Sequence, residues 1–241
     1  MTISYFTNSK RPAYAFLFAG ILLVFVELFD FLFLRGSGVM NGAEKWLSFL
    51  VAFIPGGTLT IFVVNLFIGV YLVWSDTQEG VKLSIDTFWI MLFESLIWAI
   101  LIYLLLPSFI AKLLPNQINL PMQAGAVLRP SLIQEIALSL SAGFFEELLF
   151  RLLLVQGVLW FLGTMNIGKG FSSIRYAIIL LAALLFSAVH YIPPFGDPFE
   201  FWSFTYRAAF GLIMNALLVL RGFGIVAWTH ALYDILVFSL R

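Results

Sequence analysis

The chain contains no cysteine and few charged residues: only 11% of its 241 residues are Asp, Glu, Lys or Arg, whereas 62% are hydrophobic. Without cysteine it can form no disulfide, no thiolate metal site and no cysteine nucleophile. Lys plus Arg and Asp plus Glu both number 13, so there is no basic excess, and we expect no nucleic-acid partner. A composition this apolar predicts an integral, multi-pass membrane protein surrounded by the lipid bilayer.

Apolar runs long enough to cross a bilayer cover most of the chain. A membrane-spanning helix needs about 20 apolar residues, and this length predicts an all-α helical bundle of about seven to eight transmembrane helices. The expected spans are residues 13–34, 46–74 with a break at Pro55 to Gly57, 88–106 with an end or kink at Pro107, 131–162, 174–192, 201–220 and 222–240. Residues 115–130 contain three prolines and predict a loop outside the hydrocarbon, a candidate lid. Lys and Arg are divided too evenly between the two ends of the spans to fix their orientation.

Two adjacent carboxylates and an arginine lie inside the apolar run 131–162. A charge at bilayer depth costs roughly 2.5–3.5 kcal/mol on insertion scales, so Glu146, Glu147 and Arg151 require a compensating role. Glu147 and Arg151 are four residues apart and share one helix face, where they can pair. Glu146 points about 100° away from Glu147, toward a narrow stripe of polar and small side chains. We therefore expect a structural Glu147–Arg151 ion pair and a Glu146 that faces a cavity without its own cation, the alternative being one packing network of all three.

The chain has only two histidines, and each lies at helical spacing from a second residue of interest. His190 follows Phe186 by four residues, and His230 precedes Asp234 by four, so each pair shares a helix face. A single histidine in a membrane helix usually serves as an interhelical hydrogen-bonding group. Glu146, both histidines and Asp234 are each unfavourable alone in lipid, and one shared aqueous cavity would offset all four. The sequence therefore predicts a catalytic set made of Glu146, His190, His230 and Asp234.

Three motifs resemble those of a known family. The stretches EELLFR, FSAVH and HALYD fit the E-E-x-x-x-R, F-x-x-x-H and H-x-x-x-[ND] motifs of the CAAX-protease and bacteriocin-processing family of intramembrane proteases, in the same order. The CAAX prenyl endopeptidase is a member of this family. The resemblance implies that residues 131–241 form the protease core and that residues 1–130 are variable N-terminal transmembrane helices and a loop, within one membrane domain.

The resemblance implies an intramembrane endopeptidase that hydrolyses a peptide bond in a membrane-associated protein or peptide, as in CAAX-type or sorting-tail processing. Glu146 would be the general base that activates water, and His190 would hold that water or share its proton. His230 and Asp234 would lie on the other side, where the peptide carbonyl becomes an oxyanion. In a prokaryote the protein would lie in the cell membrane.

The resemblance also implies three supporting residues. Glu147 and Arg151 would hold their helix in register, and Phe186 would pack beneath His190. Asp234 departs from the Asn that many relatives carry, because an ionised Asp cannot donate a hydrogen bond to an oxyanion. It is therefore either protonated or has another role, such as orienting His230.

Two further questions stay open at this point. We favour a mechanism without a cofactor, although two imidazoles with carboxylates also suit a divalent metal such as zinc, with ligands from Glu146, His190, His230 and Asp234. The histidines do not form an H-E-x-x-H pair. Arg207 could bind a substrate carboxylate in the cavity or extend toward the membrane surface. The rival functions are a metal-dependent protease of the same family and a non-catalytic immunity or transport protein of the membrane.

Overall fold

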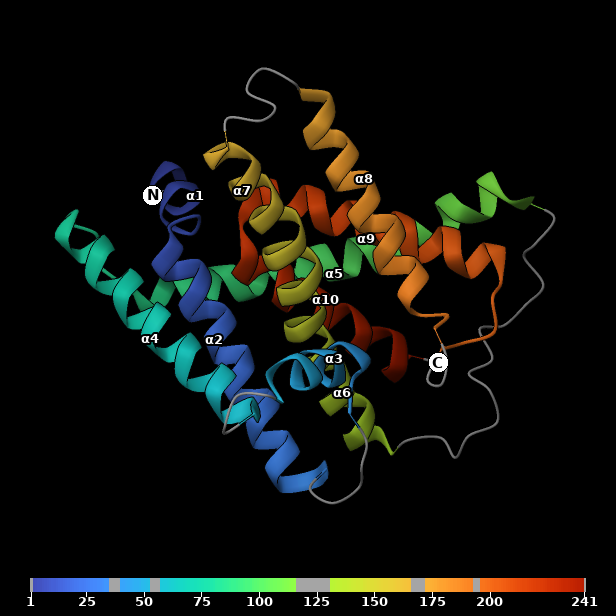
Figure 1. Cartoon of the computed structure of the whole chain (residues 1–241), viewed down its shortest axis with the longest axis horizontal. Coiled ribbons are helices and arrows are strands. Elements are labelled where there is room, and N and C mark those ends of the chain that lie inside the picture. The colour runs from blue at the N-terminus through green and yellow to red at the C-terminus, as the bar shows by residue number, and fades with distance from the viewer. Residues whose placement is uncertain are drawn as a thin grey trace.

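The computed structural model describes residues 2–34, 40–52, 57–115, 131–165, 172–192 and 196–240. Within these ranges every regular element is a helix, as Figure 1 shows, so the expected all-α class is confirmed for the described part of the chain. The break expected at Pro55 to Gly57 lies largely outside these ranges, since the description resumes at Gly57. The candidate lid at 115–130 also lies outside them except for Pro115.

Apart from α1, which no apolar run predicts, the helices follow one another in the expected order. Their bounds are α1 Thr2–Asn8, α2 Pro12–Phe29 with the π-helical η1 Asp30–Leu34, α3 Gly42–Val51, α4 Gly57–Gln78, α5 Ile85–Leu113, α6 Leu132–Glu147, the π-helical η3 Leu148–Gly157, α7 Val158–Thr164, α8 Ser172–Val189, α9 Phe201–Arg221 and α10 Phe223–Ser239.

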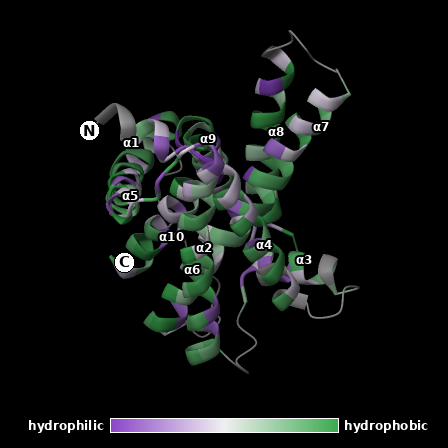
Figure 2. Cartoon of the chain, turned by 90° about the vertical axis from the view of Figure 1, so that its left-hand side faces the viewer, coloured by the Kyte–Doolittle hydropathy of each residue, from purple (hydrophilic) through white to green (hydrophobic). Residues whose placement is uncertain are grey.

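Three helical segments of the described chain are long and apolar enough to cross a bilayer: Pro12–Leu34, Ile85–Leu113 and Phe201–Arg221. The helices at Ser173–Val189 and Phe223–Ser239 are apolar but shorter. Figure 2 shows that hydrophobic residues dominate the helical ribbons. The structure thus agrees with a helical membrane bundle, while the count of seven to eight spans stays a prediction.

The structure corrects the bounds of two expected spans. Pro107 does not end its helix, because α5 continues to Leu113. Membrane helices tolerate an internal proline where neighbouring groups satisfy the freed backbone carbonyl. The span expected at 174–192 is shorter, because α8 ends at Val189 and leaves His190 in the following turn. The long helix expected at 131–162 is a continuous helical run through α6, η3 and α7.

Local sequence signals explain several helix ends. Ser131 and Gln134 form a capping box at the start of α6, in which each side chain bonds the backbone N–H of the other residue. Pro12 occupies the first turn of α2, where a missing N–H is harmless. Gly222 joins α9 to α10 with φ of 85°, a left-handed conformation that favours glycine. This residue allows the chain to reverse with no intervening loop.

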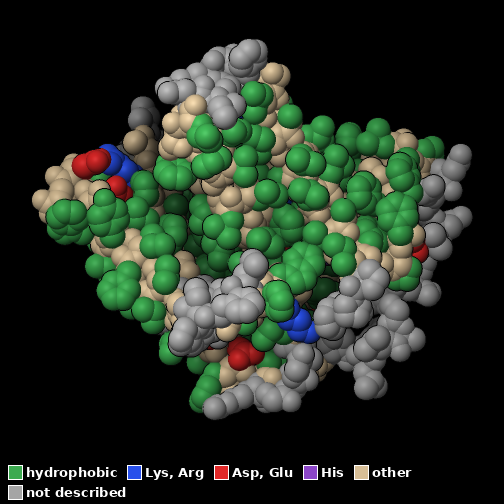
Figure 3. Space-filling model, viewed as in Figure 1, with side chains coloured by type: hydrophobic (Ala, Val, Ile, Leu, Met, Phe, Trp, Pro, Cys, Tyr) green, Lys and Arg blue, Asp and Glu red, His purple; other side chains and the backbone are tan. Residues whose placement is uncertain are grey.

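Helix α10 lies at the centre of the bundle, packed against α6, α5 and α2 (Figure 1). All nine residues from Phe223 to Ala231 are buried, as expected for a helix that is apolar on every side. Trp228 fixes it to α2 by donating its indole N–H to the Phe18 carbonyl at 2.8 Å. The outer surface instead exposes many large apolar side chains, which cover most of the face in Figure 3. This arrangement suits contact with lipid outside and a polar site within.

A partly buried ion pair attaches the N-terminal helix to the bundle. Arg221 at the end of α9 donates two hydrogen bonds to the Glu94 carboxylate of α5, at 2.5 and 2.7 Å. Tyr5 of α1 donates to the same carboxylate at 2.5 Å, and Arg221 also donates to the Ser9 hydroxyl at 2.8 Å. Because the charged groups satisfy one another, they can remain inside an apolar bundle.

Candidate active site

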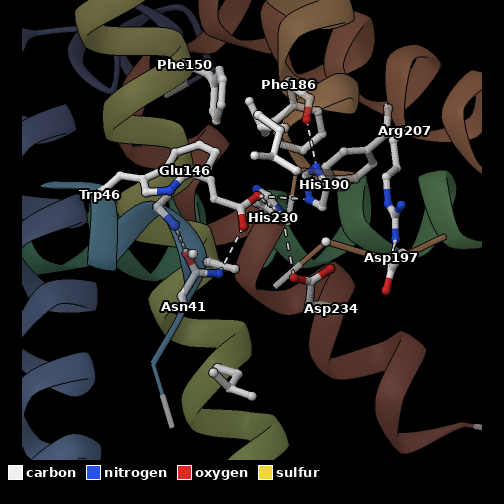
Figure 4. Close-up of a pocket in the computed structure, with 18 of the residues that line it drawn as sticks. Asn41, Trp46, Glu146, Phe150, Phe186, His190, Asp197, Arg207, His230 and Asp234 are labelled. Carbon is white, nitrogen blue, oxygen red and sulfur yellow. Dashed lines mark hydrogen bonds and ion pairs between the residues drawn. The ribbon is translucent and has the colours of Figure 1, made fainter. Parts of the chain in front are cut away.

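The predicted site residues meet at one cavity of about 570 Å³. Figure 4 shows Glu146 reaching it from α6, His190 from the turn after α8, and His230 with Asp234 from α10. The remaining wall comes from α3 and the two residues before it, from α9, and from Phe150, Ile192, Gly196 and Asp197. The structure therefore brings together all four residues for which the sequence predicted a shared aqueous pocket.

The Glu146 carboxylate occupies the middle of this group. One oxygen, Oε2, lies 3.9 Å from the Nε2 atom of His190 and also 3.9 Å from the Nε2 atom of His230. The other oxygen, Oε1, accepts a hydrogen bond of 3.0 Å from the side-chain amide of Asn41. The residue is only 8% exposed, so its charge is compensated by these few groups rather than by bulk water.

Both histidine rings are oriented by a partner on their far nitrogen. His190 Nδ1 lies 2.7 Å from the Phe186 carbonyl, and His230 Nδ1 lies 2.6 Å from a carboxylate oxygen of Glu147. A carbonyl and a carboxylate only accept, so each Nδ1 must carry the hydrogen. In the neutral ring the lone pair is then on Nε2, the atom that faces Glu146.

Glu147 has two contacts, of which the sequence predicted one. Its Oε2 atom lies 3.0 Å from Arg151 Nε, as expected from their spacing, and both side chains are almost fully buried. Its Oε1 atom accepts the hydrogen bond from His230 described above. Arg151 also lies over the Phe186 ring, 4.4 Å from its centroid, and the same ring packs edge-on against His190. Glu147 thus links the ion pair to the orientation of His230.

Asp234 lies on the cavity side of His230. Its Oδ2 atom is 3.6 Å from His230 Nε2, and 23% of its side chain is exposed. The orienting contact on Nδ1 belongs to Glu147. Asp234 therefore lies beside the Nε2 edge of the imidazole that faces Glu146.

A close approach of α6 and α10 sets the distance between the Glu pair and His230. A Cβ atom added at Gly143 would lie 2.5 Å from the Ala231 Cβ atom, 2.6 Å from the Ala231 backbone nitrogen and 2.7 Å from the Ala227 carbonyl oxygen. Small residues at such a crossing allow helix backbones to come together in membrane proteins. Gly143 lies one turn before Glu147, and Ala231 directly follows His230, so this contact is adjacent to the site.

The structure also places residues in the cavity wall that sequence reasoning missed. Asn41 reaches the cavity from the residue before α3, and Lys45 and Trp46 reach it from α3 itself. Tyr206 and Tyr233 also line the cavity, and their hydroxyl groups form a hydrogen bond of 2.6 Å. The pattern Asn-Gly-Ala-Glu could have identified Asn41 as a helix cap, but no local signal places it beside Glu146, 105 residues away.

Arg207 lies in the cavity wall rather than at the outer surface. Its Nη2 atom is 2.5 Å from an Asp197 carboxylate oxygen, and its guanidinium lies 5.2 Å from the centroid of the Tyr191 ring. Its charge is therefore already paired. Binding of a substrate carboxylate at this position stays a prediction that would require competition with Asp197.

The imidazole and carboxylate groups are of the types that bind zinc, but they lie farther from one another than zinc ligands do. Ligands at about 2.0–2.1 Å from a tetrahedral zinc lie about 3.3 Å from one another, whereas Glu146 Oε2 is 3.9 Å from each histidine Nε2. Across the described ranges no three His, Asp or Glu side chains are arranged to hold a metal ion. The side chains would have to move inward to bind one.

Comparison with known proteins identifies the C-terminal part of the chain. Residues 129–236 match the sequence model of the family described as type II CAAX prenyl endopeptidase Rce1-like. No significant match was found among curated proteins or among solved structures. The matched region includes the four cavity residues Glu146, His190, His230 and Asp234. Over these residues the chain is similar to the type II CAAX prenyl endopeptidases, in agreement with the CAAX-protease and bacteriocin-processing family that the three motifs resemble.

Proposed function

We propose that this chain is an endopeptidase that hydrolyses a peptide bond in a membrane-associated protein or peptide with a water molecule activated by Glu146. The observation that carries the proposal is the position of Glu146 Oε2, 3.9 Å from both histidine Nε2 atoms inside the cavity. Each gap of 3.9 Å allows a water molecule to lie about 2.8 Å from Oε2 and from the facing Nε2 atom, an ordinary hydrogen-bond length. It can then donate one hydrogen to the carboxylate and the other to a histidine.

The reaction requires one group that accepts a proton and later returns it. As the water oxygen attacks the peptide carbonyl carbon, its proton passes to Glu146 Oε2, and the carbonyl π electrons move to the oxygen. When the tetrahedral intermediate collapses, the C–N bond breaks and Glu146 gives the proton to the leaving nitrogen. The products are a new carboxyl end and a new amino end, and Glu146 is restored. His190 Nε2 accepts a hydrogen bond from the water molecule. This bond orients a lone pair of the water oxygen toward the substrate carbonyl.

His230 is the group best placed to stabilise the oxyanion. Glu147 holds the hydrogen on its Nδ1, and a second proton on Nε2 would face both Glu146 and Asp234. The resulting imidazolium would donate from Nε2 to the developing negative charge. In this scheme Asp234 supports the charge of His230 and donates nothing itself, which accounts for Asp at a position where many relatives carry Asn.

The substrate of this proposal is an extended segment that enters from the membrane. A peptide bond inside a helix is protected by its backbone hydrogen bonds, so the scissile segment must be unwound where it meets water in the cavity. CAAX-type and sorting-tail segments are the two substrate classes that the family suggests. Segments of both classes are membrane-associated, and in both the cleaved bond lies close to the end of the substrate chain.

The function is tested by mapping new protein ends. Membranes from cells that produce the chain are expected to contain shortened proteins that are missing in cells without it. The purified chain in proteoliposomes, supplied with one of these proteins in ¹⁸O-water, is expected to place one ¹⁸O atom in each new carboxyl group. Unchanged protein ends, combined with an ion flux that requires the chain, would identify a transporter instead. Binding without cleavage would identify a non-catalytic immunity protein.

Removal of divalent metal ions is expected to leave the cleavage rate unchanged, because Glu146 alone can accept the proton from water. The measurement is the rate in proteoliposomes before and after dialysis against EDTA and 1,10-phenanthroline. A zinc protease of the thermolysin type, treated in parallel, provides the control that must lose activity. If the chain loses activity and added zinc restores it, the metal-dependent mechanism with the same four residues replaces the one proposed.

A further inference from the structure

The residue before α3 contacts the proposed general base from a part of the chain that precedes the family match. Asn41 Nδ2 donates a hydrogen bond of 3.0 Å to Glu146 Oε1, and the match begins at residue 129. We propose that Asn41 is a positioning residue for Glu146: it holds one carboxylate oxygen so that the other faces the two histidines. This inference rests on the proposed function for its catalytic consequence, but the contact itself can be tested without a substrate.

The cap of α3 determines which edge of the Asn41 amide faces Glu146. Asn41 Oδ1 accepts a hydrogen bond of 2.8 Å from the Ala43 backbone N–H, as an N-cap residue does. The oxygen of the amide is therefore committed to the helix, and the NH₂ group is left on the opposite edge. Because that edge can only donate, it requires an accepting oxygen at Oε1, and it favours the ionised form of Glu146, to which a hydrogen bond is stronger.

The hydrogen bond also restricts rotation of the carboxylate. The terminal torsion of a glutamate side chain is broad, so an unheld carboxylate samples many orientations. With Oε1 fixed by Asn41, Oε2 is kept at equal distances of 3.9 Å from His190 and His230. Helix α3 also contributes Lys45 and Trp46 to the cavity wall, so it is a part of the site in its own right. A carboxylate that rotates freely at this position would lower the reaction rate, because small displacements of a catalytic group reduce rates strongly.

Two substitutions separate capping from positioning. Ser and Asp cap helices about as well as Asn, so Asn41→Ser and Asn41→Asp should both preserve α3. Asn41→Ser removes the donor to Glu146 and is expected to lower kcat about tenfold. Asn41→Asp places a second carboxyl group beside Glu146, with which it would share a proton, and is expected to lower kcat about 100-fold. KM should change little, because the substrate contacts remain. The probe is a fluorogenic peptide that ends in a prenylated CAAX sequence, cleaved by the full chain in proteoliposomes.

A double-mutant cycle on thermal unfolding provides a readout that needs no substrate. Asn41→Ser is expected to lower Tm in the native background and to have a much smaller effect in a Glu146→Ala background, since the bond is already absent there. Equal Tm changes in both backgrounds, or no change in either, would show that Asn41 only caps α3 and would overturn the inference. Full kcat in both Asn41 variants would overturn it too. If the native protein fails to cleave the peptide while the cycle shows coupling, the positioning contact stands and the prenylated substrate class is rejected.

Discussion

Glu146→Gln is expected to lower the cleavage rate by about 10³-fold or more, which is within the range for removal of a general base. The Gln side chain has the same size, and its oxygen can still accept the hydrogen bond that Asn41 donates to Glu146. It cannot accept a proton from water at the position between His190 and His230. The fold should therefore persist while the chemistry stops. The measurement is kcat in proteoliposomes together with the unfolding temperature of the same preparation.

Glu135→Gln is the matched control for this variant. Glu135 lies on the same helix, α6, in its first turn, and is partly exposed. The substitution removes one carboxylate from α6 without touching the cavity, so full activity is expected. Residual cleavage by Glu146→Gln at a rate near that of Glu135→Gln would show that Glu146 is not the base. An ion flux lost only in Glu146→Gln, without any cleavage by the native chain, would favour a proton pathway.

Gly143→Leu is expected to affect both stability and activity, because α6 and α10 cannot approach closely with a side chain at this position. Even the first added carbon would lie 2.5 Å from the Ala231 Cβ atom and 2.7 Å from the Ala227 carbonyl oxygen. Overpacking of this kind costs about 1–3 kcal/mol and at times more. A shift of about 1 Å between Glu146 and His230 would reduce the rate by about 100-fold. Gly143→Ala should show the same changes to a smaller extent.

Gly163→Ala is the control for the glycine substitution. Gly163 lies in α7 on the same continuous helical run, and a Cβ atom there meets nothing within 4 Å. Thermal unfolding in detergent and cleavage in proteoliposomes should both match the native protein. If Gly143→Ala is as stable and as active as Gly163→Ala, the two helices are less tightly packed than described, and the distance from Glu147 to His230 is set elsewhere.

Helical spacing was enough to predict which carboxylate of the adjacent pair faces the cavity. Glu147 and Arg151 share a face and form the expected contact at 3.0 Å, while Glu146 turns toward the histidines. Such a prediction succeeds because the periodicity of a helix is a local property. The spacing of His230 and Asp234 placed both at the cavity for the same reason.

Contacts between helices could not be predicted in the same way. Asn41 and Glu146 are 105 residues apart, and Glu147 and His230 are 83 residues apart. Both contacts depend on how α3, α6 and α10 cross, which is decided by side-chain packing over the whole bundle. The sequence also placed His190 inside a helix, whereas it lies in the turn after α8. An apolar run indicates a membrane span but not the residue at which its last turn ends. The number of membrane crossings depends on tilt and length together, so composition alone leaves it open.

The central position of α10 has a consequence for how the protein is made. This helix follows the others in chain order, yet it contacts α2, α5 and α6 and carries His230 and Asp234. During synthesis the earlier helices must enter the membrane before their central partner has left the ribosome. Until α10 is in place, Glu146 lacks His230 and Asp234 beside it. Under the proposed function, we therefore expect proteolytic competence only once α10 has packed against α2, α5 and α6.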